Sequence, residues 1–240
     1  MRRLALLPAL PALLLAACAP AASPRTLAVS PAPAVQAAFS DEGVVWSDGK
    51  VACAARAPQF LPVCPPWPAP TGSVAWNGGQ PWAALPALGQ VVTVDGPAQT
   101  VLAGRVAALS AMRIYREDGS ALTYSGVPAG SVPGQPSAAV TGGDGQDYVW
   151  LAGQLLPTNH PGQGRPAGGP FLWATPAGAE SGPFPSALTR RGRLELRGDQ
   201  VFLGAERQPL PAPALALGTV QGRPYVLTRS GDSWRVIPVF

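Results

Sequence analysis

The sequence predicts an all-β fold, built from short antiparallel strands that are joined by tight turns. Short apolar runs recur along the chain, and most are followed by turn residues and then by a second apolar run. Asp-Gly and Asn-Gly pairs supply the positive φ angles that two-residue hairpin turns need. Gly or Pro also interrupts nearly every window that is long enough for an amphipathic helix. The 240 residues include 30 prolines and 28 glycines.

Six β-hairpins are expected from this pattern, each with a glycine-containing turn between two apolar runs. The expected strand pairs are 44–46 with 50–53, 74–76 with 81–83, 91–94 with 100–102, 112–116 with 121–124, 194–196 with 201–203, and 225–228 with 234–240. Residues 103–112 are the one stretch that allows a turn or two of helix. Residues 153–187 are dense in Pro and Gly and predict a long surface excursion around one strand, 171–173.

The composition favours a folded domain over a disordered chain. Pro and Gly together make up about a quarter of the residues, which approaches the range of low-complexity segments. The hydrophobic fraction of 47% nevertheless indicates a buried core, and the charged fraction is only 12%. Disorder needs the opposite balance, with low hydrophobicity and high charge. We therefore expect a loop-rich domain over residues 39–240.

A loose internal repeat suggests how the strands are arranged. Residues 43–46 (GVVW) are similar to 73–76 (SVAW), 148–151 (YVWL) and, more weakly, 193–196 (RLEL). Four short strands per unit, at roughly 40–45 residues a unit, resemble the repeat of β-propellers. That resemblance implies about four or five small blades around a central channel. A β-sandwich or an irregular barrel is the alternative, because the spacing of the repeats is uneven.

The first eighteen residues read as an export signal. Arg2 and Arg3 precede an apolar run, 4–15, that is shorter than the ~20 residues of a membrane-spanning helix. A basic start, a short apolar run and small residues at its end are typical of a secretory signal peptide. The last four residues, Leu15-Ala16-Ala17-Cys18, resemble the lipobox of bacterial lipoproteins. An ordinary signal peptide cut at Ala17-Cys18-Ala19 is the alternative.

The lipoprotein resemblance implies a covalent membrane anchor on Cys18. In that family the cysteine thiol receives a diacylglyceryl group, the signal peptide is removed before it, and the new amino terminus gains an acyl chain such as palmitate. The mature protein would then start at Cys18, with residues 1–17 removed and a Pro/Ala-rich tether over 18–38. We expect a bacterial cell-envelope protein, held on the membrane and facing outside the cytoplasm, because two or three acyl chains anchor stably.

The cysteine count agrees with this assignment. Cys18, Cys53 and Cys64 are the three cysteines. If Cys18 carries lipid, Cys53 and Cys64 remain as a pair, which should be oxidised outside the cytosol. Zinc is the competing use, but two cysteines and one distant histidine cannot supply four ligands. We therefore predict a Cys53–Cys64 disulfide and no metal site.

The sequence gives little support for a nucleic-acid partner or for a nucleotide cofactor. The formal net charge is +4, and it is +2 without Arg2 and Arg3 of the leader. The arginines are scattered, with one small cluster at 190–193, whereas a nucleic-acid surface shows a strong basic stripe. No phosphate-binding loop or dinucleotide fingerprint follows a strand and opens a helix. The sequence thus predicts neither nucleic-acid binding nor a cofactor.

Four residues are candidates for contact with a ligand or partner. His160 is the single histidine and has no nucleophile motif beside it, so a catalytic role is not expected. Asp144 and Asp147 could supply two carboxylates, although the simpler interpretation is a turn before a strand. Trp67 lies in a Pro-rich loop beside Cys64 and is expected to be exposed. The repeated tryptophans 46, 76 and 150 are instead expected to pack in the core.

These observations predict a non-enzymatic binding or scaffold module that contacts an envelope protein or glycan. Two alternatives remain. The first is an extracytoplasmic hydrolase or carbohydrate-active enzyme that uses acids such as Asp144 and Asp147, which would require apposed carboxylates in a cleft. The second is a purely structural envelope protein.

Overall fold

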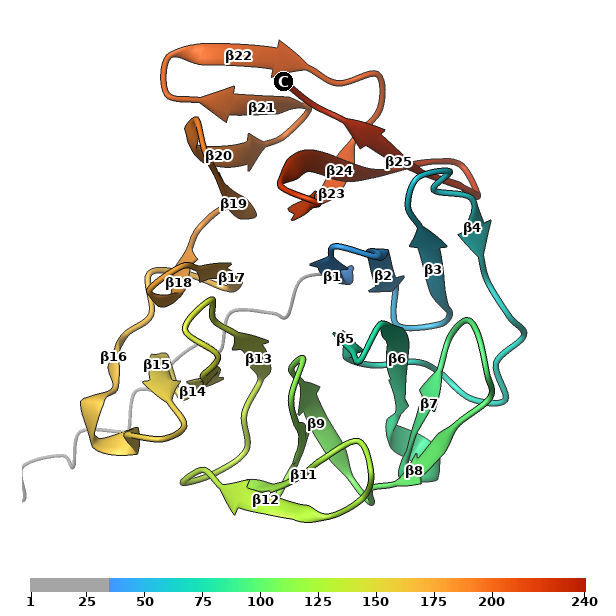
Figure 1. Ribbon diagram of the computed structural model, residues 1–240, viewed down its shortest axis with the longest axis vertical. Coiled ribbons are helices and arrows are strands. Elements are labelled where there is room, and N and C mark those ends of the chain that lie inside the picture. The colour runs from blue at the N-terminus through green and yellow to red at the C-terminus, as the bar shows by residue number, and fades with distance from the viewer. Residues whose placement is uncertain (1–34) are drawn as a thin grey trace, which may run out of the picture.

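The computed structural model describes residues 35–240, which form small antiparallel sheets arranged in a ring (Figure 1). The chain passes once around the ring, so that the last sheet lies beside the first. The expected signal peptide 1–17, the lipidation site Cys18 and most of the tether 18–38 lie outside the described residues. Strand β1 begins at Gln36, so the fold starts three residues before the expected boundary at Phe39.

The sheets follow the chain order. The first contains β1 (Gln36–Ser40), β2 (Gly43–Ser47), β3 (Ala52–Arg56) and β4 (Pro62–Val63). The second contains β5 (Val74–Asn77), β6 (Gln80–Leu85), β7 (Gln90–Thr93) and β8 (Thr100–Leu102). The third contains β9 (Val106–Leu109), β10 (Ile114–Arg116), β11 (Ser120–Leu122) and β12 (Pro128–Ser131). The fourth contains β13 (Ala138–Thr141), β14 (Asp147–Leu151), β15 (Gln154–Pro157) and β16 (Arg165–Pro166).

The second half of the ring is less regular. A two-stranded sheet contains β17 (Phe171–Thr175) and β18 (Gly178–Gly182). The next sheet contains β19 (Ser186–Thr189), β20 (Gly192–Arg197), β21 (Gln200–Leu203) and β22 (Glu206–Pro209). The last contains β23 (Ala214–Val220), β24 (Arg223–Ser230) and β25 (Ser233–Pro238). Two short 3₁₀ helices, η1 (Pro86–Leu88) and η2 (Pro161–Gln163), complete the described elements.

The all-β, propeller-like prediction is confirmed. All six expected hairpins form, as β2–β3, β5–β6, β7–β8, β10–β11, β20–β21 and β24–β25. The stretch 103–112, where a helical turn was allowed, contains strand β9 instead. The Pro/Gly-rich stretch 153–187 is also more structured than expected, since β15 to β18 lie within it.

The ring holds more sheets than the four or five blades expected. Six sheets have three or four strands, and the remaining sheet, β17–β18, has two. The inner strands of the first four sheets begin at Gln36, Val74, Val106 and Ala138, closer together than the roughly 40–45 residues per unit assumed from the repeat. Short strands and tight turns shorten each unit, so more units fit in the same length of chain.

Apolar side chains fill the spaces between adjacent sheets. One cluster joins the first and second sheets and includes Val45, Ala54, Val74 and Trp76. Similar clusters lie between the second and third sheets, the third and fourth sheets, the last two sheets, and the last and first sheets. The repeated tryptophans 46, 76 and 150 are all buried, as predicted for core residues. Trp46 and Trp150 lie on the second strands of their sheets and Trp76 on an inner strand, so the three rings reach the core from different strand positions.

The ring closes through side chains, because the first and last sheets share no strand in the described part of the chain. Trp46 packs on Trp234, with ring centroids 5.5 Å apart. The Asp41 carboxylate accepts a hydrogen bond from the Gln221 main-chain N–H at 2.9 Å. Gly218 in β23 leaves room for the ring of Phe39 in β1. Closure thus depends on the fit of a few contacts between residues about 180 positions apart in the chain.

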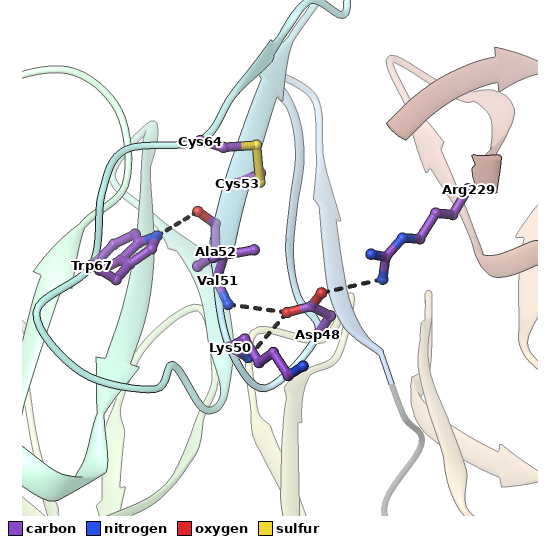
Figure 2. The surroundings of a disulfide bond; sticks show 8 residues. All are labelled: Asp48, Lys50, Val51, Ala52, Cys53, Cys64, Trp67 and Arg229. Atoms are coloured by element: carbon purple, nitrogen blue, oxygen red, sulfur yellow. Dashed lines mark hydrogen bonds and ion pairs between the residues drawn. A yellow bond between two sulfur atoms is a disulfide. The ribbon is translucent and has the colours of Figure 1, made fainter. Parts of the chain in front are cut away.

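One ion pair also joins these two sheets. Arg229 Nη1 lies 3.3 Å from Asp48 Oδ2, and Asp48 also accepts hydrogen bonds from the N–H groups of Lys50 and Val51 (Figure 2). Burial raises the pKa of the Asp48 carboxyl, but these N–H groups and the guanidinium outweigh it and hold the pKa below its ordinary value. The carboxylate therefore stays ionised and paired at neutral pH.

The predicted disulfide is present. Cys53 in β3 and Cys64, just after β4, are bonded, with their Cα atoms 4.3 Å apart (Figure 2). The bond ties the short outer strand β4 to the first sheet. Among residues 35–240, we find no helix with the length and apolarity that a membrane crossing needs.

Removing the disulfide should destabilise the first sheet measurably. The two cysteines are 11 positions apart, and closing a loop of this size contributes about 3 kcal/mol on the loop-entropy model. We expect reductant, or the double change Cys53→Ala and Cys64→Ala, to lower the free energy of unfolding by about this amount. Urea unfolding followed by tryptophan fluorescence measures it. Reductant should not change the urea midpoint of the double variant, which is the control. If reductant also leaves the urea midpoint of the native protein unchanged, the expected stabilisation by the disulfide is wrong.

Candidate functional site

The inner strands of the seven sheets surround a central channel. Two cavities, of about 490 and 210 Å³, share seven lining residues. Each inner strand contributes one of them: Ala37, Val74, Leu109, Ala139, Leu172, Ser186 and Leu217. The two cavities therefore lie on either side of this ring of seven residues. We call these seven residues the waist, the larger cavity the wide end and the smaller cavity the narrow end.

The wide end lies where the inner strands end and the chain turns outward. Its rim includes small residues and exposed main chain, such as Gly78, Gly79 and Ala111. Its hydroxyl groups come from Ser40, Ser110, Thr141, Ser186 and Thr219. Glu42 is the one charged residue among those that line it, and its carboxylate accepts a hydrogen bond from Ser40 Oγ at 2.8 Å. The wide end thus presents hydrogen-bonding groups with little charge.

The narrow end lies where the inner strands begin. It is lined by aromatic, aliphatic and proline side chains, including Trp150, Phe171, Pro170, Pro185 and Leu215. The polar lining residues are Gln36, Ser73, Ser137 and Ser186, and none of the lining residues is charged. Val35, the first described residue, also lines this end. The narrow end is therefore the more apolar of the two.

A buried carboxylate supports the rim of the wide end. Asp147, in β14, is only 1% exposed and accepts three hydrogen bonds from hydroxyl groups. The donors are Ser110 Oγ at 2.7 Å, Tyr115 OH at 2.8 Å and Thr141 Oγ1 at 2.5 Å. Burial, followed by the Asp147 charge, raises the pKa of Tyr115 far above its ordinary value, so the phenol stays protonated and donates. Asp147 thereby joins the third and fourth sheets.

The same polar network extends to the second sheet. Ala111 receives a hydrogen bond at its carbonyl oxygen from the Asn77 side chain at 2.7 Å. Its main-chain N–H donates to Thr141 Oγ1 at 3.0 Å. Three neighbouring sheets are thus connected beneath the wide end, which holds the rim loops in place.

Asp144 and Asp147 do not act as a pair in this arrangement. Asp144 is exposed in the turn before β14, where it accepts hydrogen bonds from Tyr148 OH at 2.7 Å and the Gln146 N–H at 3.1 Å. The Tyr148 hydroxyl, followed by that N–H, lowers the pKa of Asp144. One carboxylate therefore serves a turn and the other a buried network, and neither is among the lining residues of the channel.

The structure places the other two candidates away from the channel. Trp67 is half-buried and packs against the cluster between the first and second sheets, and its Nε1–H donates to the Ala52 carbonyl oxygen at 2.8 Å (Figure 2). It is therefore less exposed than its Pro-rich surroundings suggested. His160 is exposed, just before η2. Within residues 35–240, no three His, Cys, Asp or Glu side chains are grouped to hold a metal ion.

Comparisons with known proteins concern the fold. No family model and no curated protein matches this sequence. One chain in a crystal structure of the mitotic checkpoint complex is similar over 85% of this chain and 89% of that chain, with a TM-score of 0.58 and 11% identity. A streptogramin B lyase structure matches over 85% of this chain and 82% of that chain, with a TM-score of 0.44 and 11% identity. PorZ of Porphyromonas gingivalis, a surface component of a type-IX secretion system, matches over 85% of this chain and 38% of that chain, with a TM-score of 0.48 and 12% identity.

At these identities a likeness supports only the arrangement of the strands. The similarity to the chain of the mitotic checkpoint complex agrees with a propeller fold. The TM-scores of the other two structures are too low to support an argument. The function of this chain has to be argued from its own residues.

Proposed function

We propose that this protein is a lipid-anchored bacterial cell-envelope protein whose propeller is a non-enzymatic binding or scaffold module. The anchor is supported by the basic residues Arg2 and Arg3, the short apolar run 4–15 and the lipobox-like end at Cys18. The Cys53–Cys64 disulfide is consistent with export to an oxidising compartment. The wide end of the channel is the binding face in this proposal.

The main support for a binding role is the set of residues that line the wide end. Turns from the inner strands gather around one opening, which small side chains leave accessible. Main-chain atoms there can orient a neutral, hydrogen-bonding ligand, whereas most of the hydroxyl groups already donate hydrogen bonds within the chain. With Glu42 as the one charged lining residue, the face suits an envelope glycan or an uncharged protein loop better than a phosphate-rich partner.

The carboxylates favour binding over glycoside hydrolysis. Glycosidases use two acids on opposite sides of one bond, within a cleft. Here Asp147 is enclosed by three hydroxyl donors, and Asp144 is exposed in a turn with its own partners. This arrangement does not favour the alternative of a hydrolase that uses these two acids.

The anchor is tested by removing its thiol. In the variant Cys18→Ser, no thioether to a diacylglyceryl group can form, so we expect the protein to move from the detergent phase to the aqueous phase on Triton X-114 partitioning. Ser23→Ala, within the expected tether, is the matched control and should stay in the detergent phase. Incorporation of radiolabelled palmitate into Cys18→Ser at the level of the parent protein would contradict acylation at this residue.

The binding face is tested by crowding the wide end. Ala111 is exposed at the rim, so the variant Ala111→Arg places a long cation at the opening without filling the core. We expect it to weaken binding to envelope glycan fragments or to an isolated envelope partner by at least about tenfold, which corresponds to ~1.4 kcal/mol. Isothermal titration calorimetry with each isolated ligand measures the affinity.

Val127→Arg is the matched control for this test. Val127 is 57% exposed and is not among the lining residues of either cavity. The control should bind like the parent protein. Equal binding by both variants would place the binding surface elsewhere on the molecule.

A further inference from the structure

The charged side chains are distributed unevenly around the ring. Residues 183–240, which form the last two sheets, contain eight arginines and four acidic residues, a formal net charge of +4. Residues 35–182 contain six basic and nine acidic residues, a formal net charge of −3. Opposite charge steers the encounter of two molecules. An acidic partner is therefore attracted to the part of the ring that the last two sheets form.

One side of the sixth sheet (β19–β22) is left partly uncovered by its neighbour. The fifth sheet (β17–β18) has two strands, whereas the sheets on either side of it have four (Figure 1). Strand β17 lies beside β19, the inner strand of the sixth sheet. In the described chain, the fifth sheet has no third or fourth strand to cover the outer strands β21 and β22 on this side.

The two sides of the sixth sheet differ in chemistry. Leu194, Leu196 and Val201 are at most 3% exposed and pack against the last sheet. Side chains alternate between the two faces of a strand, so the residues next to these three point to the other side. We define the open face as that side, with Arg193, Glu195, Arg197, Phe202, Arg207 and the preceding loop residue Phe184.

Contacts with the fifth sheet show which way the open face points. The guanidinium of Arg193 lies over the Trp173 ring of β17, with Cζ 4.6 Å from the ring centroid. Arg193 Nη1 also lies 4.0 Å from a carboxylate oxygen of Glu180 in β18. The open face therefore begins at the two-stranded sheet and continues outward past its last strand.

The arginines of the open face are ordered by aromatic rings and are not fully neutralised. Arg197 Cζ lies 5.1 Å from the Phe184 ring centroid and 5.2 Å from the Phe202 ring centroid, and its side chain is 50% exposed. Glu195 is shared, since it pairs with both Arg193 and Arg197. Arg207 is exposed, and its side chain has no hydrogen bond or ion pair within residues 35–240. Stacked guanidinium groups keep their planar donors available for carboxylates.

We propose that the open face binds an extended, acidic segment of a partner protein, lying where further strands of the fifth sheet would lie. Alternate side chains of an extended segment point the same way, about 7 Å apart, so one row of carboxylates can pair with Arg197 and Arg207. Apolar side chains of the same segment can pack on Phe184 and Phe202. A flat membrane surface fits less well, because these arginines lie within the strands of a sheet and not at its protruding turns.

The probe for this test is a fluorescein-labelled heptapeptide of alternating Glu and Val. The protein is the chain 18–240 carrying Cys18→Ser, which contains every described element. We expect a saturable rise in fluorescence anisotropy that weakens as NaCl is added, because salt screens exposed charges. The same peptide with Gln in place of each Glu should bind at least about tenfold more weakly. Equal affinity for the two peptides would overturn the proposal.

The double variant Arg197→Gln with Arg207→Gln should weaken binding of the acidic peptide by at least about tenfold. The matched control is Arg223→Gln with Arg235→Gln, which removes the same charge from two exposed arginines of the last sheet. The control should bind within about twofold of the parent. Equal weakening by both pairs would show attraction by net charge alone and would overturn the site. If thermal unfolding shows that the first pair does not fold, Arg207→Gln alone should still weaken binding by at least about threefold.

Vesicles of phosphatidylglycerol test the other anionic surface. Sedimentation with these vesicles that is lost in the Arg197 and Arg207 double variant, without saturable peptide binding, would assign the open face to a membrane and overturn the proposal. The open face is also separate from the wide end, since none of its residues lines either cavity. Ala111→Arg should therefore leave peptide affinity unchanged, and the double variant should leave binding at the wide end unchanged.

Discussion

Gly218→Ala is expected to lower the free energy of unfolding by about 3 kcal/mol, because overpacking at the closing contact forces the first and last sheets apart. A Cβ atom at Gly218 would lie 2.2 Å from Phe39 Cγ and 2.8 Å from Phe39 Cβ. These atoms are at the base of the side chain and cannot move away as the tip of a flexible side chain would. Urea unfolding measures the loss, and a drop in Tm of about 6–12 °C should accompany it.

Gly162→Ala is the matched control for this prediction. Gly162 lies in η2, and a Cβ atom there would meet no heavy atom within 4 Å. Its stability should change by no more than about 0.5 kcal/mol. Phe39→Ala in the Gly218→Ala chain should remove most of the extra cost, because the two positions are in contact. Equal stability of the two glycine variants would show that ring closure does not depend on this fit.

Asp147→Ala is the second change with a large expected effect. It removes a buried acceptor and leaves the hydroxyl groups of Ser110, Tyr115 and Thr141 without their partner. Hydrogen bonds to a charged group contribute about 1.5–3 kcal/mol each, and buried polar groups without partners add a penalty. We expect a loss of about 3–5 kcal/mol in the free energy of unfolding.

The neighbouring carboxylate provides the control. Asp144→Ala removes an exposed acid from the turn four residues before Tyr148, and it should leave the urea midpoint close to that of the parent protein. Tyr115→Phe removes one donor and leaves the carboxylate in place. Its loss of stability should fall between the losses of Asp147→Ala and Asp144→Ala. Urea unfolding of the three variants under one condition gives the order. An Asp147→Ala loss no larger than that of Asp144→Ala would contradict the role of Asp147 in joining the sheets.

The hairpins were predictable because turn chemistry is local. Asp48-Gly49 and Asp118-Gly119 favour a tight turn whatever lies around them, and Gly49 and Gly119 do have positive φ angles. The disulfide was predictable for a similar reason, since Cys53 and Cys64 are close in the chain and are the pair that remains if Cys18 carries the proposed lipid. The number of sheets was not, because the first four sheets follow one another more closely than the roughly 40–45 residues per unit assumed from the repeat.

The candidate site was much less predictable than the hairpins. The channel is lined by small residues such as Ala37 and Ala139, which no motif distinguishes from other alanines. Asp147 was noticed as one of two nearby acids, but its partners Ser110 and Tyr115 are more than 30 positions away in the chain. Trp67 looked exposed because its loop is rich in proline, and its hydrogen bond to Ala52 depends on how that loop folds back.

Features that the sequence predicts and features that only the tertiary structure shows differ in how far apart in the chain the contacting residues are. Strand and turn preferences, the leader and the cysteine pair involve residues close together in the chain, so their chemistry can be interpreted from the sequence. The closure of the ring, the two ends of the channel and the burial of Asp147 depend on contacts between distant segments. Phe39 and Gly218 meet because seven sheets together turn the chain through a full circle, and neither residue carries a signal of that contact.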